Sequence, residues 1–447
     1  MSRDAIFAPA LHRARRQRLL DELGDGVLLL PTAAETSRNG DVLNEFRPGS
    51  DFHYLTGFPE PAAVLVAWRT GRNAHTTWLF VRQRDKAREV WDGRRHGTAG
   101  AKRLFGADDA FPVEQLWQKL PLLLDGKPRL FHRLGGDAEF DRRLLDTFAA
   151  NARRQRRRQP TLHPTITDPI PALAAQRLVK DGAELKALRM AAAISAEGHT
   201  VAMRATRPGC REFEVQAALE AEFRRRGSPR NGYPSIVASG ANACVLHYHD
   251  NDRRMRAGDL LLIDAGAEFG GCTADITRTF PVAERFTPAQ AAVYRVVLRA
   301  QLAGIRACAV GAPWDRAHKV CVRLLTQGLV DLGVLRGNVA RLVKKEKYKP
   351  FYMHGTSHWL GRDVHDVGAY LDAAGEPRQL VAGAVLTVEP GLYFDPRDRR
   401  VPAIYRGIGV RIEDDVLVTA KGPVVLTAGV PKDVEAIERM RAEALRR

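Results

Sequence analysis

Residues 260–281 read LLLIDAGAEFGGCTADITRTFP, and this stretch decides how the second half of the chain folds. An apolar run ends at Asp264, a glycine-rich turn follows, and polar and apolar residues then alternate from Asp275 to Phe280. Alternation with a period of two indicates a strand whose two faces differ in polarity. The stretch therefore predicts a β-hairpin that carries one aspartate on each side of its turn.

The position of the turn decides how the two aspartates face each other. A two-residue turn at Phe269-Gly270 places Asp264 directly opposite Asp275, whereas a turn at Gly270-Gly271 makes them diagonal neighbours. Both arrangements put the two carboxylates on the same face, where directly opposed Cβ atoms lie about 5 Å apart. Carboxylates so close repel each other unless one binds a proton or a cation lies between them. Taken alone, the stretch would be explained more simply by two solvated aspartates at a strand end.

Three further segments carry residues of the same chemistry. HGTSHWLGRDVHD, residues 354–366, places three histidines in a loop that is punctuated by glycine. An apolar run ends at Glu389 within LTVEPG, and Glu413 lies on a largely apolar strand within GVRIEDD. A carboxylate in a buried strand is costly unless it is paired or bound to metal. Each of these residues alone has a structural explanation, but together with the two aspartates they predict a shared metal site.

The remaining sequence indicates two domains. A chain of 447 residues is longer than one ordinary core. Short apolar runs such as residues 27–30 and 77–81 lie between helical patterns, which is typical of an α/β domain. A charged, proline-rich segment near residues 150–175 marks a linker. We expect an α/β domain over residues 1–172 and an α+β domain over residues 173–447.

Composition and charge exclude several classes of protein. Hydrophobic residues make up 45% and charged residues 27%, which is typical of a folded protein, and no apolar run is long enough for a membrane span. The five cysteines form no CxxC pair, which favours reduced thiols in the cytoplasm. The net charge of +17 suggests nucleic-acid binding, but the densest basic run, RRQRRR at residues 153–158, holds no aromatic residue and matches no nucleic-acid motif. We expect neither nucleic acid nor a membrane as a partner.

The motif segments resemble those of a known enzyme family. LLLIDAGAEFGGCTADITRTFP, FYMHGTSHWLGRDVHDVG, VLTVEPGLY and YRGIGVRIEDD are similar to the signature segments of the Xaa-Pro aminopeptidase (aminopeptidase P) family. In the first half, SDFHYLTGFPEPAAVLV and EVWDGRRHG resemble the same family, so the likeness covers nearly the whole chain. The resemblance implies a creatinase-like N-terminal domain and a catalytic domain with the pita-bread fold, which is shared with prolidase and methionine aminopeptidase.

The resemblance also implies a reaction and a set of metal ligands. Members hydrolyse the Xaa-Pro bond at peptide N-termini by attack of a hydroxide that bridges two metal ions. By position, Asp264 would bind one metal ion, His358 and Glu389 the other, and Asp275 and Glu413 both. Four carboxylates balance two divalent cations, and oxygen ligands with one imidazole suit Mn²⁺ while accepting Co²⁺ or Zn²⁺. The resemblance favours manganese.

Further residues match family positions around the substrate. Glu389 is the expected general base, and the expected neighbours of the substrate are His247, His354, His365, Tyr393 and Arg411. The proline ring of a peptide substrate would fit against His247, His365 and Tyr233, and its N-terminal amine would approach Asp264. His249 has no counterpart in the family, and we expect it to be a structural or surface residue.

Several alternatives stay open on the sequence alone. Family members often carry an arginine shortly after the segment of His365, where this chain has YLDAAGEP, and Arg378 is the nearest candidate. A prolidase that cleaves only Xaa-Pro dipeptides is the nearest alternative function, and a catalytically silent peptide-binding relative is a more distant one. The resemblance implies a homodimer or homotetramer. Trp91 is a candidate for a contact with a neighbouring subunit, or else an ordinary partly buried aromatic.

Overall fold

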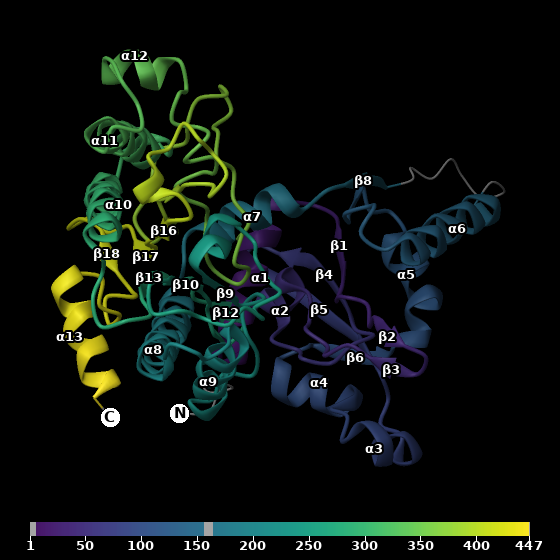
Figure 1. The fold of residues 1–447 in the computed structure, drawn as a ribbon. Coiled ribbons are helices and arrows are strands. Elements are labelled where there is room, and N and C mark those ends of the chain that lie inside the picture. Colours follow the sequence, from purple (N-terminus) through teal and green to yellow (C-terminus); the bar gives the residue numbers. More distant parts are fainter. Residues whose placement is uncertain (1–5, 156–163, 447) are drawn as a thin grey trace. The chain divides into compact units, whose positions relative to one another are not determined.

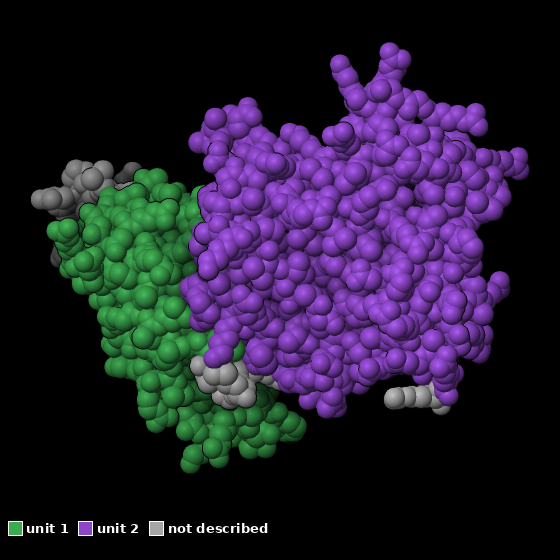
Figure 2. All heavy atoms as spheres, turned by 90° about the vertical axis from the view of Figure 1, so that its left-hand side faces the viewer, with its two compact units in different colours: residues 1–176 green, residues 177–447 purple. Residues whose placement is uncertain are grey.

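The computed structural model describes residues 6–155 and 164–446, which form two compact units, Met1–Gln176 and Arg177–Arg447 (Figures 1 and 2). The division falls after Gln176, where the sequence suggested residue 172. The last three arginines of the basic run at residues 153–158 lie outside the described residues. Among the helices that the structure describes, none combines the length and the apolar character that a membrane crossing requires.

Unit 1 is built on a six-stranded sheet in the order β6-β5-β4-β1-β7-β8. Near its centre, β1 (Val27–Pro31) runs antiparallel to β4 (Val64–Gly71) and parallel to β7 (Arg129–Phe131). Alternate residues of β1 enter two buried clusters, one with Val27 and the other with Leu28, because successive side chains point to opposite faces. This mixed sheet with its helices confirms the α/β prediction.

The other elements of unit 1 follow the apolar runs of the sequence. The sheet is completed by β5 (Ala74–Val81), β6 (Asp109–Pro112) and β8 (Thr165–Thr167), and β2 (Ser37–Asn39) pairs with β3 (Val42–Leu43). The helices are α1 (Pro9–Leu23), α2 (Ser50–Thr56), α3 (Lys86–Asp92), α4 (Gly97–Phe105), α5 (Leu116–Leu124) and α6 (Ala138–Gln155). Helix α7 (Ile170–Leu178) crosses the boundary between the units.

Unit 2 combines small antiparallel sheets with helices, as expected for an α+β domain. One sheet has the order β13-β10-β9, with β13 (Thr277–Pro281), β10 (Leu260–Asp264) and β9 (Ile236–Ser239). A second has the order β14-β17-β18, with β14 (Val385–Val388), β17 (Asp414–Leu417) and β18 (Val424–Val425). Two short ladders pair β11 (Glu268–Phe269) with β12 (Cys272–Thr273), and β15 (Gly391–Tyr393) with β16 (Gly409–Arg411).

Six helices accompany these sheets in the described part of unit 2. They are α8 (Gly182–Ala205), α9 (Glu212–Arg225), α10 (Pro288–Ala307), α11 (Arg316–Asp331), α12 (Val339–Lys344) and α13 (Val434–Leu445) (Figure 1). Helix α8 begins after Asp181, because Asp181 and Glu184 form a reciprocal capping box. Thr287 and Gln290 start α10 in the same way.

The hairpin of residues 260–281 turns at Gly270 and Gly271. Both glycines adopt positive φ angles, 60° and 73°, as a two-residue hairpin turn of the primed type requires. Phe269 pairs with Cys272, and Asp264 pairs with Thr277. Asp264 and Asp275 are therefore diagonal neighbours on one face, which is the second of the two arrangements expected.

The two glutamates of the expected site are brought together by a shared register. In the ladder of β14 with β17, Val388 pairs with Asp414, and in the ladder of β15 with β16, Gly391 pairs with Arg411. The same register continues across the gap between the ladders, so that Glu389 and Glu413 occupy opposed positions. Glu413 lies in this gap, not within a strand as the sequence suggested, because Pro390 cannot donate a ladder hydrogen bond.

Candidate active site

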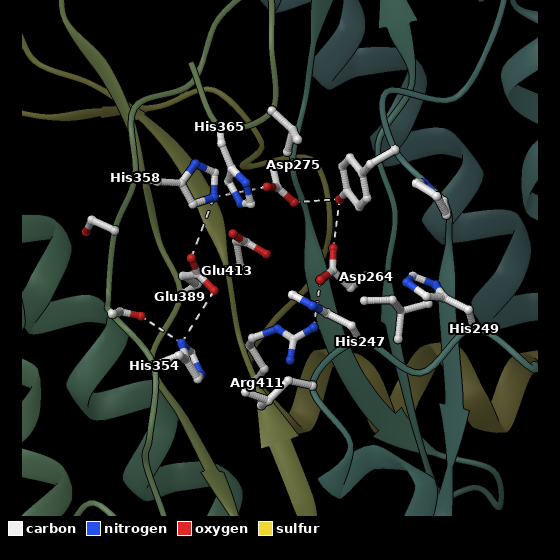
Figure 3. A pocket seen from close by; sticks show the side chains of 17 residues that line it. His247, His249, Asp264, Asp275, His354, His358, His365, Glu389, Arg411 and Glu413 are labelled. Atoms are coloured by element: carbon white, nitrogen blue, oxygen red, sulfur yellow. Dashed lines mark hydrogen bonds and ion pairs between the residues drawn. The ribbon is translucent and has the colours of Figure 1, made fainter. Parts of the chain in front are cut away.

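A cavity of 460 Å³ in unit 2 collects nearly all of the residues that the sequence singled out. Its lining comes from segments far apart in the sequence, including the ends of β10 and β16 and the loop of residues 354–366 (Figure 3). The expected residues that line it are Tyr233, His247, Asp264, Asp275, His354, His358, His365, Glu389, Arg411 and Glu413.

Three of the expected metal ligands form the tightest cluster. Asp275, His358 and Glu413 each offer a ligand atom within 4.8 Å of the others. His358 Nε2 lies 3.4 Å from Asp275 Oδ2 and 3.6 Å from Glu389 Oε1. Its Nδ1 lies 3.0 Å from the carbonyl oxygen of Trp359, which only accepts, so Nδ1 carries a proton, and in the neutral ring the lone pair of Nε2 faces the carboxylates. This tautomer suits a metal ligand.

Asp264 is joined to this cluster through a tyrosine. The hydroxyl oxygen of Tyr233 lies 2.7 Å from Asp264 Oδ1 and 2.5 Å from Asp275 Oδ1. A tyrosine has one hydroxyl proton, so it can donate to only one of these oxygens at a time. The second short contact needs an additional positive charge, from a proton or from a metal ion. The sequence suggested Tyr233 only as a wall for the proline ring.

The electrostatics of the cluster also favour bound cations. Burial, together with repulsion from Asp275, raises the pKa of Glu413 well above its ordinary value. Burial likewise raises the pKa of Glu389, to about 7. Burial by itself lowers the pKa of His358, but the neighbouring Asp275 and Glu389 outweigh it and raise that pKa to about 9. Without cations, the site would have to hold extra protons, and divalent metal ions would take their place.

Arg411 links the carboxylates to the residues behind them. Its Nη2 donates to Asp264 Oδ2 at 2.6 Å, its Nη1 to the hydroxyl of Tyr393 at 3.2 Å, and its Nε to Thr277 Oγ1 at 3.1 Å. The hydroxyl of Thr277 in turn donates to Glu413 Oε2 at 2.6 Å. Sequence reasoning did not identify Thr277, although it lies on the polar face of the hairpin next to Asp275.

His354 and Tyr393 form a pair beside Glu389. His354 Nε2 lies 2.8 Å from the hydroxyl oxygen of Tyr393, and His354 Nδ1 lies 3.7 Å from Glu389 Oε2. Burial lowers the pKa of His354 to about 3, so this imidazole is neutral at physiological pH. Tyr393 does not itself line the cavity and reaches it through His354 and Arg411.

The outer part of the cavity is formed by exposed histidines. His247, His249 and His365 are all exposed, and the ring of His365 lies against that of His358 with centroids 4.4 Å apart. His249 lines the cavity, which the sequence did not predict. Arg378 is not among the lining residues.

Sequence reasoning also did not identify two residues whose side chains accept hydrogen bonds from the backbone of the proposed ligands. Asp415 accepts the backbone N–H of Asp275 at 3.2 Å, and Thr387 Oγ1 accepts the backbone N–H of His358 at 3.1 Å. The two consecutive aspartates after Glu413 in IEDD could have indicated Asp415, because acidic residues are unusual in an apolar strand. A single threonine in such a strand, as at Thr387, gives no comparable indication. These contacts fix the backbone on which the ligands stand.

Comparisons with known proteins agree with this arrangement. A family model described as metallopeptidase family M24 matches residues 186–420, and one for the aminopeptidase P N-terminal domain matches residues 12–131. The chain is 42% identical over 431 residues to the Xaa-Pro aminopeptidase of Escherichia coli (strain K12), covering 96% of this chain and 97% of that protein.

Solved structures give the same result. The structure of Pseudomonas aeruginosa aminopeptidase PepP shares 46% sequence identity at a TM-score of 0.95, with 99% of each chain covered. Zinc-substituted E. coli aminopeptidase P in complex with product shares 41% identity at a TM-score of 0.94, covering 98% of this chain and 99% of that chain.

This chain belongs to metallopeptidase family M24, within its aminopeptidase P group. The resemblance that the motif segments suggested is thereby confirmed. So are the pita-bread fold of unit 2 and the assignment of the chain to the metal-dependent peptidases.

Proposed function

We propose that the chain is an exopeptidase that hydrolyses the Xaa-Pro bond at the N-terminus of peptides and releases the N-terminal residue. The observation that carries this proposal is the convergence of four carboxylates and the imidazole of His358 in one cavity. Proteins that match nearly the full length of the chain bear the name Xaa-Pro aminopeptidase, which favours an aminopeptidase over a dipeptidase.

The site would hold two divalent metal ions. Asp264, Asp275, His358, Glu389 and Glu413 would hold them, with Asp264 on the side of one ion and His358 and Glu389 on the side of the other. The donor set fits, because the tautomer of His358 is that of a metal ligand and the crowded carboxylates lack enough positive charge. When bound, such ions lower the pKa of a water molecule and polarise the scissile carbonyl.

The residues of the chain would then orient the substrate and move protons. Glu389 is the proposed general base, and a buried carboxylate of raised pKa is suited to accept a proton near neutral pH. His354 is a neutral donor beside it, since burial lowers its pKa to about 3, and partial desolvation also lowers the pKa of His365, whose ring lies against that of His358. Arg411 fixes Asp264, which would receive the N-terminal amine of the substrate. His247 and His365 would contact the proline ring.

We propose manganese as the metal, with cobalt or zinc as substitutes. Four of the five proposed ligands, Asp264, Asp275, Glu389 and Glu413, are carboxylates, and hard oxygen ligands suit Mn²⁺ better than a thiolate-rich site would. The test is metal analysis of the purified protein, followed by chelation and readdition of single metals. We expect two metal ions per chain, loss of activity with chelator, and the largest recovery with Mn²⁺.

We further propose a cytoplasmic homodimer or homotetramer. All five cysteines are free, which agrees with a reducing compartment. On α3, Val90 is 81% exposed and Trp91 is 84% exposed, and such apolar side chains are typical of a contact surface. Light scattering gives the mass in solution, and Trp91→Ala should lower it if Trp91 lies in a subunit contact.

The decisive experiment for the activity uses purified protein with added Mn²⁺. Xaa-Pro-Yaa tripeptides should be cleaved, and the same peptides with alanine in place of proline should not. Activity confined to Xaa-Pro dipeptides would assign a prolidase instead, and no hydrolysis together with no bound metal would assign a silent relative. Glu389→Gln should lower kcat by about 10² to 10⁴, the usual contribution of a general base.

A further inference from the structure

The second exposed histidine of the loop after β9, His249, is held in the cavity by the residue before it. The side chain of Tyr248 points away from the cavity and donates to Glu212 Oε2 at 2.8 Å. Glu212 is fully buried and also accepts the backbone N–H of Ser239 at 2.6 Å and that of Arg253 at 2.9 Å. Because Tyr248 is anchored, its two histidine neighbours both line the cavity.

The two imidazoles form a matched pair. The rings of His247 and His249 lie nearly parallel, with centroids 6.4 Å apart and planes inclined by 20°. Within the described part of the chain, neither ring has a hydrogen-bond partner, whereas His354 and His358 are both bonded. Every imidazole carries at least one N–H donor in either protonation state. His249 therefore offers a free donor to whatever enters the cavity.

The strand order places His249 on one particular side of the site. In the sheet β13-β10-β9, Asp264 on the middle strand pairs with Thr277 on one side and with Ile236 on the other. Asp275, two residues before Thr277, belongs to the metal cluster, whereas Ile236 belongs to an apolar cluster against which Tyr248 packs. In Figure 3, Asp264 accordingly lies between His358 and His249.

This side of the cavity is a wall that is apolar at its base and polar at its edge. Among its lining residues Ile236 is buried and Leu246 is half-buried, whereas Pro234 and His249 are exposed. If the N-terminal amine of a substrate approaches Asp264, the side chain of the N-terminal residue extends along this wall. A substrate side chain with an apolar stem and a hydrogen-bond acceptor at its tip would complement this wall, because its stem would contact the apolar residues and its tip would reach His249.

We propose that His249 selects the residue before proline, by donating a hydrogen bond to the carbonyl oxygen at the tip of a glutamine-like N-terminal side chain. The proposal rests on the Xaa-Pro aminopeptidase activity proposed above, since it assigns the side-chain pocket of that same site. His249 binds substrate here and takes no part in the bond cleavage.

The test compares two substrates that differ only at the tip of this side chain. Gln-Pro-Yaa and Met-Pro-Yaa have stems of similar length, but only glutamine has a carbonyl acceptor. With Mn²⁺ and the wild-type protein, we expect kcat/KM to be higher for the glutamine peptide. In His249→Phe, which keeps a ring without a donor, the ratio of the two kcat/KM values should fall by roughly three- to tenfold, the usual worth of one hydrogen bond.

Separate values of kcat and KM, and two further variants, distinguish a binding role of His249 from a structural one. The loss should appear mainly as a higher KM for the glutamine peptide, because the contact is the same in the ground and transition states. His249→Gln, which retains an N–H donor, should restore part of the ratio. Val245→Ala alters an exposed residue of the same loop that does not line the cavity and should leave the ratio unchanged.

Two failures are distinguishable. If the wild-type protein cleaves neither peptide, the proposed function is wrong and the inference falls with it. If the wild type cleaves both peptides and His249→Phe keeps the wild-type ratio, the function stands and the role of His249 is refuted.

Discussion

Thr277 is hydrogen-bonded to both Glu413 and Arg411, two charged residues of the site. Its hydroxyl donates to Glu413 Oε2 and accepts from Arg411 Nε, so that the orientation of a proposed bridging ligand depends on a residue that touches no substrate. Side chains in this position orient metal ligands, and their loss typically weakens metal binding by 10- to 100-fold.

Thr277→Val removes this hydroxyl and keeps the shape of the side chain. We expect metal affinity to fall by about 10- to 100-fold, measured by calorimetric titration of the metal-free protein with Mn²⁺. Thr279→Val is the matched control, because Thr279 lies on the same strand face but bonds only to backbone atoms of Arg411. Equal affinities for the wild type and Thr277→Val would contradict the prediction.

For single residues, the sequence identified the charged members of the site but not the uncharged residues that hydrogen-bond to them. Crowded carboxylates are conspicuous because each is costly in an apolar setting. A hydroxyl such as that of Tyr233 or Thr277 is common in proteins, and its role depends on which distant segment it meets. His249 was missed for a related reason, since only the anchoring of Tyr248 determines where its ring points.

The loop of residues 361–366, which contains His365, is held in place by a buried cluster of charged residues. Asp366 accepts from Lys180 Nζ at 2.6 Å and from Arg177 Nη2 at 2.5 Å, and its side chain is 0% exposed. Gly361 leaves room for that carboxylate, because a Cβ there would lie 2.1 Å from Asp366 Oδ2. The sequence shows this aspartate only as the last letter of the histidine motif.

Asp366→Ala should therefore be strongly destabilising. It leaves the buried Lys180 without its carboxylate and removes one of the two carboxylates that pair with Arg177, and breaking such a buried pair typically costs about 3 to 5 kcal/mol. The free energy of unfolding is measured by urea denaturation. Asp363→Ala is the control: the side chain of Asp363 is 37% exposed, and we expect a change within about 1 kcal/mol. Similar losses in both variants would refute the argument.

Element boundaries show why part of the fold could be predicted. Strand β10 and helices α8 and α10 carry strong local signals, namely an apolar run and capping boxes. The choice between two hairpin turns could not be made from local sequence, because Phe269-Gly270 and Gly270-Gly271 both permit a tight turn. The structure has the Gly270-Gly271 turn, in which both glycines adopt positive φ and Phe269 pairs with Cys272.

At the scale of the whole molecule, each unit contains a buried histidine that is held neutral. Burial lowers the pKa of His75 in unit 1 and of His199 in unit 2, in both cases to about 4. His199 is fully buried and bonds to the carbonyl oxygen of Ala265 through Nε2. Its Nδ1 has no hydrogen-bond partner among the described residues, so a proton there would be poorly solvated.

These histidines make stability depend on pH in a definite direction. In the unfolded chain His199 binds a proton below its ordinary pKa of 6.5, whereas in the folded chain it stays neutral until about pH 4. The contribution of neutral His199 to the free energy of unfolding is therefore fully present above pH 6.5 and is lost as the pH falls toward 4. For His199 alone the loss between pH 7 and pH 5 is about 2 kcal/mol. Urea denaturation at both pH values should show a smaller difference for His199→Gln than for the wild type, and equal differences would contradict it.

The division into an α/β and an α+β unit followed from the spacing of apolar runs, but the exact boundary did not. Helix α7 continues through it, so that no break in local structure marks the division at Gln176. The chemistry of the carboxylates and histidines suggested a shared metal site, but only the resemblance indicated which five residues form it. No local pattern tells that residues more than a hundred positions apart share one cavity.

The continuous register that opposes Glu389 and Glu413 has a consequence for how this enzyme can tolerate changes in length. Side chains alternate between faces along a strand, so inserting a single residue between Val388 and Gly391 would turn one carboxylate away from the other. The excursion of residues 394–408 lies outside both ladders and can lengthen or shorten without that effect. We therefore expect a change of length at the far end of the hairpin to leave the two glutamates opposed.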